Sequence, residues 1–366
     1  AMELNINQLT LAWLNSARGI ANGKIKYLLE YFNTPEEIWN NFNGEVNNLT
    51  ELTQETKDYL IKTKKKFPDC LINKLNEEKA KIVTCFDENY PERLININNY
   101  PYILYYKGDI KEINKVSIAI VGSRKATNYG IFAAEKFTKE LSELGVNIIS
   151  GLASGIDGIA HRTAIKNNTL TFGVIGSGID VIYPKSNEIL YKNIIEAKGG
   201  VITEFPFGMK PLPSNFPVRN RIISGLSDGV LVVEAQRKSG TLITVSHAAE
   251  QGREIFAVPG NINSLYSKGT NLLIKDGAKI TTCIEDIVEE ILKLENALNE
   301  DRKKFTDELN EEEIKIINVL KTGGKTIYEI SENTHMRVND ILSYLTVLEM
   351  KNVVKQMPGK KFFVDN

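Results

Sequence analysis

Two runs of apolar, β-branched residues near the middle of the chain predict buried parallel strands, Ile118–Val121 and Val146–Ile149. Each run leads into a turn of small residues, Gly122-Ser123 after the first run and residues 150–155 after the second. A helical periodicity follows each turn. The pattern therefore predicts strand, glycine turn and helix twice in succession.

Glycine turns of this kind can bind anions, because N–H groups at a helix N-terminus point outward and small residues let a phosphate approach them. Arg124 and Lys125 stand beside the first turn. The alternative is that the glycines only allow tight strand-to-helix connections, and it stays open for both turns. For the second turn, Gly151–Asp157, a purely structural role is equally consistent with the sequence.

Residues 116–295 continue the same alternation. Further strands are expected at Leu170–Ile175, Val201–Thr203, Gly229–Val233 and Glu254–Val258. Helices are expected near 155–167, 187–198, 217–226, 240–251, 269–276 and 284–295. This order predicts an α/β fold, a doubly wound and mostly parallel sheet with helices on both faces, whose ligands sit beyond the carboxyl ends of the strands.

Smaller segments precede this core. Residues 1–66 are predicted to form a helical domain, and its turn Gly19–Gly23 resembles the helix–hairpin–helix turns that hold a nucleic-acid backbone. A structural or protein-contact role is favoured for that turn. Two strands, Lys81–Phe86 and Tyr102–Tyr106, are expected to extend an edge of the main sheet.

The chain is therefore expected to divide into a core domain at 67–295, a charged linker at 296–309 and a last domain at 310–366. The last domain has three helical patterns and two strands, the order typical of a winged helix. A winged helix that binds duplex DNA needs a basic recognition helix. Residues 309–366, however, hold eight Lys or Arg against eight Asp or Glu, so the domain has no excess of positive charge. This balance favours a protein contact or a regulatory role.

Composition limits the classes of partner and site. The 366 residues carry a formal net charge of −1, so a nucleic acid would have to be held by a local basic patch. No apolar run reaches the ~18 residues of a membrane span, and the N-terminus lacks the apolar segment of a secretion signal. The three cysteines and three histidines show no metal-ligand spacing. We expect a cytoplasmic protein without membrane contact or a metal site.

The glycine turns do not fit a dinucleotide fingerprint. The first turn, residues 122–125, lacks the G-x-G-x-x-G pattern, and Gly176-Ser177-Gly178 has Val181 where the third glycine belongs. No P-loop, G-x-S-x-G elbow or H-E-x-x-H motif occurs. We therefore expect no cofactor.

A proline-rich loop, residues 204–221, delivers an aromatic and two arginines to the start of a helix, in the order Phe216, Arg219, Asn220, Arg221. Guanidinium groups bind phosphate in a bidentate manner, and an aromatic ring gives a base a stacking surface. The alternative is that an arginine pairs with a carboxylate and orders the loop. We expect one arginine to pair with Asp228 or Glu234 and the other to be available for a ligand.

A further turn of basic, hydroxyl and glycine residues follows the strand that ends at Glu234, namely Arg237, Lys238, Ser239, Gly240 and Thr241. With the earlier turns it would bring several cations and an aromatic to one rim of the sheet. That combination suits single-stranded nucleic acid.

Asp157 and His161 lie four residues apart and share a helix face. They could act as an acid–base pair. No nucleophile or metal set accompanies them, so we favour a capping role for Asp157 and local packing or hydrogen bonding for His161.

In six segments the chain resembles the DNA-processing protein A family (DprA, also called Smf): IAIVGSRKATNYG, IISGLASGIDGIAH, GSGIDVIYP, FPVRNRIISGLS, VVEAQRKSGTLIT and GREIFAVPGN. The resemblance covers roughly residues 80–280. It implies an extended Rossmann-like domain, flanked by a SAM-like helical domain and a winged-helix-like domain. It also implies a homodimer that binds single-stranded DNA without sequence preference and loads the RecA recombinase during natural transformation.

By motif, the resemblance places the DNA pocket at Gly122, Ser123, Arg124, Phe216, Arg219, Arg221 and Lys238. The turns described above add Lys125, Asn220, Ser239, Gly240 and Thr241 to the candidate site. We expect no catalysis at this site.

Two other functions stay open. The fold is related to nucleotide phosphoribohydrolases of the lysine-decarboxylase-like family, whose P-G-G-x-G-T-x-x-E pattern supplies a catalytic Glu. This chain keeps Gly240-Thr241 but has Thr244 where that Glu would stand, which disfavours hydrolysis. The other alternative is an interaction protein whose pocket binds a small nucleotide signal.

Overall fold

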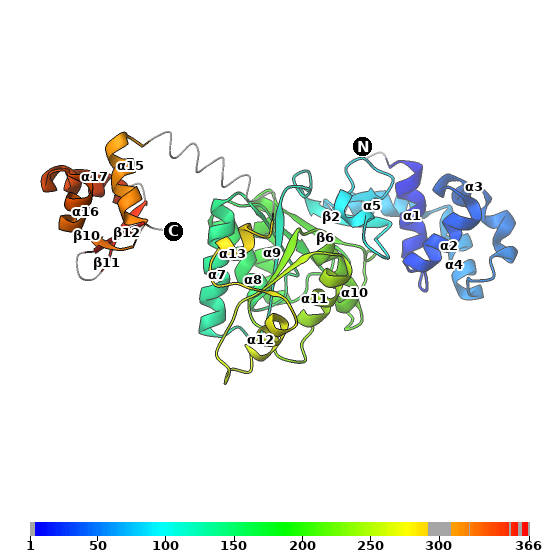
Figure 1. The fold of residues 1–366 in the computed structure, drawn as a ribbon. Helices are drawn as coiled ribbons and strands as arrows, with labels where there is room; N and C mark the ends of the chain where they lie inside the picture. Colours follow the sequence, from blue (N-terminus) through cyan, green and yellow to red (C-terminus); the bar gives the residue numbers. More distant parts are fainter. Residues whose placement is uncertain (1–3, 292–308, 322, 351–352, 358–360, 365–366) are drawn as a thin grey trace. The chain divides into compact units, whose positions relative to one another are not determined.

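The protein is represented by a computed structural model that describes residues 4–291, 309–321, 323–350, 353–357 and 361–364. Its contacts divide the chain into two compact units, Ala1–Leu294 and Glu295–Asn366 (Figure 1). The helices predicted for 1–66 and the predicted core belong to the same unit, so their separation into two domains stays a prediction. Nearly all of the predicted linker 296–309 lies outside the described residues.

The first unit is built on a sheet that has nine strands within the described residues, in the order β1-β2-β6-β5-β4-β3-β7-β8-β9. From β6 to β9 all neighbours are parallel, whereas β1 and β2 add antiparallel pairs at one edge. The strands are β1 Lys81–Thr84, β2 Ile103–Gly108, β3 Ser117–Val121, β4 Asn147–Ser150, β5 Thr171–Val174, β6 Gly200–Thr203, β7 Gly229–Val232, β8 Glu254–Ala257 and β9 Lys279–Ile280. The predicted α/β fold and the edge position of β1 and β2 are thus confirmed.

The strand order reverses between β3 and β7. From β3 the chain proceeds outward through β4, β5 and β6, and then returns to the other side of β3 with β7. In doubly wound sheets, ligands bind beyond the carboxyl ends of the strands at this switch point. Every residue of β3 is buried, which explains why its sequence is a continuous apolar run rather than an alternating one.

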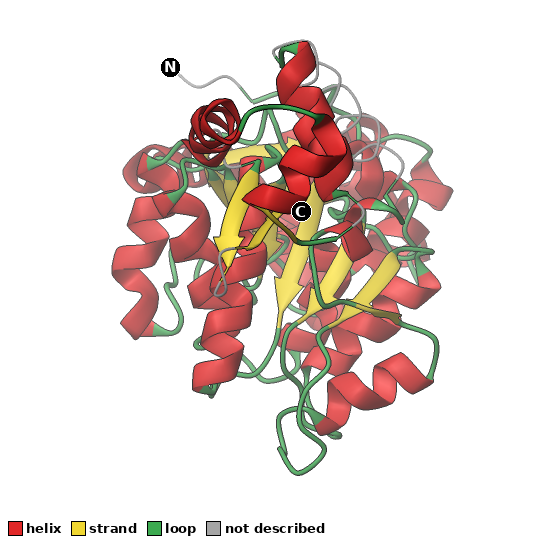
Figure 2. Cartoon of the chain, turned by 60° about the vertical axis from the view of Figure 1, so that its left-hand side comes forward, coloured by secondary structure: helices red, strands yellow, loops and turns green. Residues whose placement is uncertain are grey.

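Helices connect the strands and cover both faces of the sheet (Figure 2). They are α6 Glu92–Ile95, α7 Asn128–Glu143, α8 Ile156–Lys166, α9 Glu188–Glu196, α10 Asn215–Gly225, α11 Thr241–Glu250, α12 Lys268–Lys275 and α13 Glu285–Val288, with a short 3-10 turn at Lys185–Asn187. Of the helix predicted near 284–295, the structure describes α13 as far as Val288, and residues 292–295 lie outside the described residues. No described helix has the length and apolar character needed to cross a membrane.

The N-terminal helices are α1 Ile6–Ser16, α2 Asn22–Phe32, α3 Pro35–Glu45, α4 Gln54–Lys64 and α5 Phe67–Glu78, with a 3-10 turn at Val46–Asn48. Their core centres on Trp13, whose ring makes edge contacts with Trp39 and Phe42. Helix α5 was not predicted, although Leu71 and Leu75 bury one of its faces. Tyr105 of β2 donates a hydrogen bond to Asn15 of α1 at 3.2 Å, which ties these helices to the edge of the sheet.

The second unit contains α15 Glu311–Leu320, β10 Lys325–Thr326, α16 Ile327–Thr334, α17 Val338–Met350, β11 Val354–Met357 and β12 Lys361–Val364. The strands form a sheet in the order β10-β12-β11. Apart from the two-residue β10, this matches the predicted order of elements. Arg337, which directly precedes α17, has its guanidinium paired with Asp340 at 2.9 Å.

Candidate functional site

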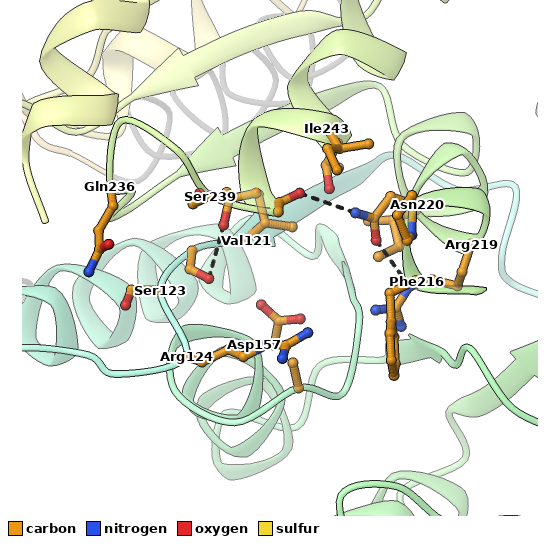
Figure 3. A pocket seen from close by; sticks show the side chains of 17 residues that line it. Val121, Ser123, Arg124, Asp157, Phe216, Arg219, Asn220, Gln236, Ser239 and Ile243 are labelled. Atoms are coloured by element: carbon orange, nitrogen blue, oxygen red, sulfur yellow. Dashed lines mark hydrogen bonds between the residues drawn. The ribbon is translucent and has the colours of Figure 1, made fainter. Parts of the chain in front are cut away.

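A cavity of about 380 Å³ lies beyond the carboxyl ends of β3 and β7, at the point where the strand order reverses. Four separate segments line it: the turn after β3, the turn after β4, the first turns of α10, and the segment from Gln236 to the start of α11. Figure 3 shows Arg124 and Asp157 on one side, Ser239 and Ile243 opposite them, and Phe216 on a third side. The convergence of these turns agrees with the sequence prediction.

Nine of the twelve candidate residues line this cavity. They are Gly122, Ser123, Arg124, Phe216, Arg219, Asn220, Ser239, Gly240 and Thr241. Lys125, Arg221 and Lys238 are not part of the lining. Lys125 and Lys238 are exposed and follow or precede lining residues directly, whereas Arg221 is buried.

Arg221 is held by a carboxylate that the sequence analysis did not assign to it. Its guanidinium donates two hydrogen bonds to Glu204, at 2.8 and 2.6 Å, and a third to the carbonyl of Asn99. The side chains of Arg221 and Glu204 are only 5% and 10% exposed. The expected pairing with Asp228 or Glu234 is therefore wrong, because the carboxylate at the other end of the proline-rich loop is closer in space.

Asp228 and Glu234 have other partners. Asp228 accepts from the guanidinium of Arg93 at 2.8 Å and from the backbone N–H of Ser117 at 2.9 Å. Glu234 accepts from the backbone N–H and the hydroxyl of Thr127. Both carboxylates thus stabilise connections within the sheet domain.

Arg219 is also buried, so it is not the freely exposed arginine that the sequence suggested. It donates to the carbonyls of Gly151 and Val174, at the ends of β4 and β5, and to the side chain of Asn220. Burial lowers the pKa of Arg219 to about 10, with the nearby Asp157 opposing the shift. The arginine remains a cation at neutral pH and is fixed in one orientation.

Asp157 does not cap its helix, which corrects the sequence expectation. It lies inside the first turn of α8, whose N-cap is Gly155, and it accepts a hydrogen bond from the N–H of Gly151 at 3.0 Å. Burial raises the pKa of this carboxyl, while Arg219 acts in the opposite direction. The second glycine turn is thus closed by a carboxylate of the chain itself.

His161 makes a local hydrogen bond, as the sequence analysis favoured. Its Nδ1 lies 2.7 Å from the hydroxyl of Thr171, and the residue is completely buried. It is not among the residues that line the cavity. The two residues therefore do not form an acid–base pair at the surface of the site.

Phe216 forms the aromatic wall of the cavity. The guanidinium groups of Arg124 and Arg219 lie 5.6 and 5.8 Å from the centre of its ring, and the ring of Tyr183 lies 5.7 Å away. Arg124 is exposed, and no ion pair is found for it within the described part of the chain. An exposed guanidinium beside a half-exposed ring can bind a phosphate and an adjacent base together.

The three glycine turns differ in what occupies their helix N-termini. Glu234 fills the N-terminus of α7, where its carboxylate binds Thr127, and Asp157 fills the turn before α8. Helix α11 begins after Gly240 without a side-chain cap, and this end lines the cavity. The N-terminus of α7 is therefore already occupied, and the phosphate contact predicted for Gly122-Ser123 stays a prediction. At Ser239–Thr241, no hydrogen-bond partner of the backbone N–H groups is found within the described residues.

Asn220 joins α10 to the turn before α11. Its Oδ1 accepts from Arg219 Nε, and its Nδ2 donates to the carbonyl of Gly240 at 3.3 Å. Thr241 in turn donates to the carbonyl of Gly122 at 3.2 Å. These hydrogen bonds fix the positions of the turns around the cavity.

Sequence reasoning missed two residues of functional interest. Tyr183 faces Phe216 and lines a small neighbouring cavity of about 50 Å³ that shares Arg124, Phe216 and Arg219 with the main one. The sequence did offer a signal for Tyr183, namely an aromatic residue shortly after the glycine turn at 176–178. Glu204 had no local signal, since its partner lies 17 positions away. Among the described residues, no group of three or more potential metal ligands is found.

Residues 81–292 match the family model of DNA recombination-mediator protein A. Over 217 residues the chain is 44% identical to the DNA processing protein DprA of Bacillus subtilis, covering 59% of this chain and 72% of that protein. It is 43% identical over 204 residues to DprA of Streptococcus pneumoniae, covering 56% and 72%. The match with protein Smf of Escherichia coli, 42% identical over 217 residues, covers 59% of this chain and 58% of that relative.

Two solved structures extend this similarity to the fold. DprA from S. pneumoniae superposes with a TM-score of 0.65 at 33% identity, covering 79% of this chain and 99% of that one. DprA from Helicobacter pylori, studied for its single-stranded DNA binding mode, gives a TM-score of 0.53 at 29% identity and covers 59% and 96%. On the family match and these relatives, the chain belongs to the DNA recombination-mediator protein A family.

Proposed function

We propose that this protein binds single-stranded DNA without sequence preference in the cavity at the switch point. The observation that carries the proposal is the meeting of the exposed Arg124, the ring of Phe216 and the uncapped N-terminus of α11 at one cavity. Family membership and the single-stranded DNA binding mode of the H. pylori relative support it.

Each group would recognise a part of the strand that every sequence shares. Arg124 and the N–H groups after Ser239 suit phosphates, and Phe216 suits the face of any base. Lys125 and Lys238, at the rim, would add electrostatic attraction to the backbone. None of these contacts requires a particular base edge.

The buried residues would position the DNA-binding surface, because their polar groups are already engaged within the chain and are not available to the strand. Arg219 holds Phe216 against the ends of β4 and β5, and Asn220 holds the turn before α11. Arg221 has its guanidinium occupied by Glu204 outside the cavity lining, so we assign it a supporting role.

We propose that the site binds without catalysis. A phosphoribohydrolase needs an acid in the pocket, and Thr244 lines the cavity at the position where that acid would stand. The one carboxylate in the lining is that of Asp157, which is engaged by Gly151 and lies beside Arg219. Incubation with nucleoside monophosphates should release no free base; steady release would refute this proposal.

The binding proposal is tested by titrating single-stranded and duplex oligonucleotides of mixed sequence. Arg124→Ala should weaken binding to all single strands alike and reduce the salt slope by about 0.7, the value for one lost phosphate contact. Phe216→Ala should cost about 1–3 kcal/mol per stacked base, a loss of about 5- to 150-fold.

Arg337→Ala is the matched control, because Arg337 is exposed and belongs to the other compact unit. It removes the same charge and should leave affinity unchanged. Equal affinity of the wild type and the Arg124→Ala and Phe216→Ala variants would refute the site assignment.

We also propose that the protein forms a homodimer in the cytoplasm and loads the RecA recombinase on strands taken up in natural transformation. The support for this proposal is the family to which the chain belongs. RecA filament growth should be faster on single strands bound by this protein than on strands without it. An unchanged growth rate would contradict the loading role while leaving the binding proposal intact.

A further inference from the structure

Helix α5 lies beside β2, where the N-terminal helices meet the edge of the sheet (Figure 1). A second cavity, of about 490 Å³, is lined by residues of α4, α5 and β2. Two helices present one face each to it. Helix α4 and the residues after it contribute Tyr59, Lys62 and Lys66, and helix α5 contributes Cys70 and Lys74. These residues lie three or four positions apart, which places each set on one side of its helix.

The floor of this cavity is aromatic. Tyr105 of β2 and Phe207 meet edge to face, with their ring centres 5.5 Å apart. The Nζ atom of Lys74 lies 5.8 Å from the centre of the Phe207 ring. Phe207 is only partly buried, so one side of it remains accessible from the cavity.

The charge at the rim is not compensated by nearby acids. Lys62, Lys66 and Lys74 are exposed, and no ion pair is found for any of them within the described residues. None of the residues that line the cavity is an Asp or a Glu. Three unpaired cations around an accessible aromatic floor form a site for a ligand that carries both negative charge and planar rings.

A third cavity adjoins the lysine-lined cavity. It shares Ser16, Pro206 and Phe207 with the lysine-lined cavity. Its lining also includes Val218, which follows Phe216 of the main cavity by two positions in α10. A strand that leaves the main cavity past Phe216 would therefore meet the third cavity at Val218 and the lysine-lined cavity at Phe207.

We propose that the lysine-lined cavity is a second subsite for single-stranded nucleic acid, which binds the continuation of a strand held in the main cavity. This inference rests on the proposed function. The lysines would bind backbone phosphates, and Phe207 would offer its face to a base. An acidic protein segment would match the charge but would leave the aromatic floor without a partner.

The test compares strands of two lengths on the full-length protein. A strand of about 6 nucleotides lies within the usual span of one single-strand site, whereas one of about 30 nucleotides exceeds it. Replacing Lys62, Lys66 and Lys74 together by Gln should weaken the long strand about 10-fold or more at low salt and lower its salt slope by about 2, at about 0.7 per phosphate contact. The affinity for the short strand should not change.

A matched triple variant controls for net charge. Lys65, Lys111 and Lys275 are exposed lysines that line none of these cavities. Their joint replacement by Gln removes the same charge and should leave the affinity for the long strand close to the wild-type value.

Cys70 provides a local readout without any substitution, since it lines the cavity and is the exposed one of the three cysteines. Burial raises the pKa of the Cys85 thiol to about 12 and also raises that of Cys283, so Cys70 should react first with iodoacetamide. The long strand should slow this alkylation, and the short strand should not.

The outcomes separate the two proposals. If the long strand binds equally well to the wild type and the Lys62/Lys66/Lys74 variant and does not protect Cys70, the second subsite is refuted while the main site stands. An acidic protein segment would then be the better match for the lysines. If neither length binds the wild type, the proposed function itself fails and the subsite fails with it.

Discussion

Acidification should destabilise the first unit through His161. The hydroxyl of Thr171 donates to the carbonyl of Ile148 at 2.9 Å, so it accepts from His161 and places the imidazole hydrogen on Nδ1. The other ring nitrogen, Nε2, is buried and has no hydrogen-bond partner among the described residues. The folded protein therefore holds this histidine in its neutral form.

The size of the effect follows from the difference in pKa between the two states. Burial, together with the charges of Arg162 and Arg219, lowers the pKa of His161 from 6.5 to about 3. As the pH falls below about 6.5 the unfolded chain binds a proton that the folded chain does not, so the unfolded state is stabilised. At about 1.36 kcal/mol per pH unit, the loss is about 2 kcal/mol at pH 5 and about 5 kcal/mol once the pH falls below 3.

The assay is urea unfolding at pH 7.5 and pH 5, followed by tryptophan fluorescence, since both tryptophans, Trp13 and Trp39, lie in the first unit. His161→Asn keeps a donor for Thr171 but does not titrate. Its free energy of unfolding should fall by about 2 kcal/mol less than that of the wild type between the two pH values. Working with this difference removes the contribution of Asp157, whose raised pKa acts with the opposite sign.

Thr171→Val serves as the control, because it removes the hydrogen bond and leaves the histidine buried. It should lower stability at both pH values and retain the wild-type loss on acidification. A wild-type protein and a His161→Asn variant with the same change between pH 7.5 and pH 5 would show that the folded state protonates His161, and the argument would be wrong.

Two further substitutions test the supporting contacts by urea unfolding. Arg221→Met leaves the buried Glu204 without its cation and should cost about 3–5 kcal/mol. The double variant with Glu204→Leu should recover most of this loss. A loss of single-strand affinity in the folded double variant would show instead that Arg221 contacts DNA. Gly130→Ala places a methyl carbon 2.2 Å from the carboxylate of Glu234 and should cost about 1–3 kcal/mol. Gly44→Ala, with no atom within 4 Å of the added carbon, should be neutral or stabilising, and equal effects at the two glycines would contradict the close contact.

The sequence was sufficient for the features that depend on local pattern. The continuous apolar run at Ile118–Val121 predicted a strand buried on both faces, and β3 is buried along its whole length. The glycine turns that follow successive strands predicted that a ligand site lies at the carboxyl ends of these strands, and the cavity is found there. Elements of two residues, such as β9 and β10, have no periodicity that could reveal them.

Partner choice among charged groups could not be predicted in the same way. Arg221 had several carboxylates within reach along the chain, and its pairing with Glu204 depends on how the proline-rich loop folds back. Similarly, nothing near Thr127 indicated that Glu234, 107 positions later, would occupy the N-terminus of α7. These contacts are decided by tertiary structure, and they determine which predicted binding residues remain available.

The distribution of these carboxylates would explain how the proposed site binds a polyanion although the chain as a whole is nearly neutral. Two of the three glycine turns receive an internal acid, which compensates their helix dipoles and rigidifies the sheet edge. Within the described part of the chain, no acid caps the turn before α11 and no ion pair is found for the exposed Arg124, and both lie at the same cavity. An anion bound there neutralises partial charges that the fold itself does not satisfy. The proposed preference for single strands would follow from Phe216, because a stacking face is useful only to a base that is not already paired within a duplex.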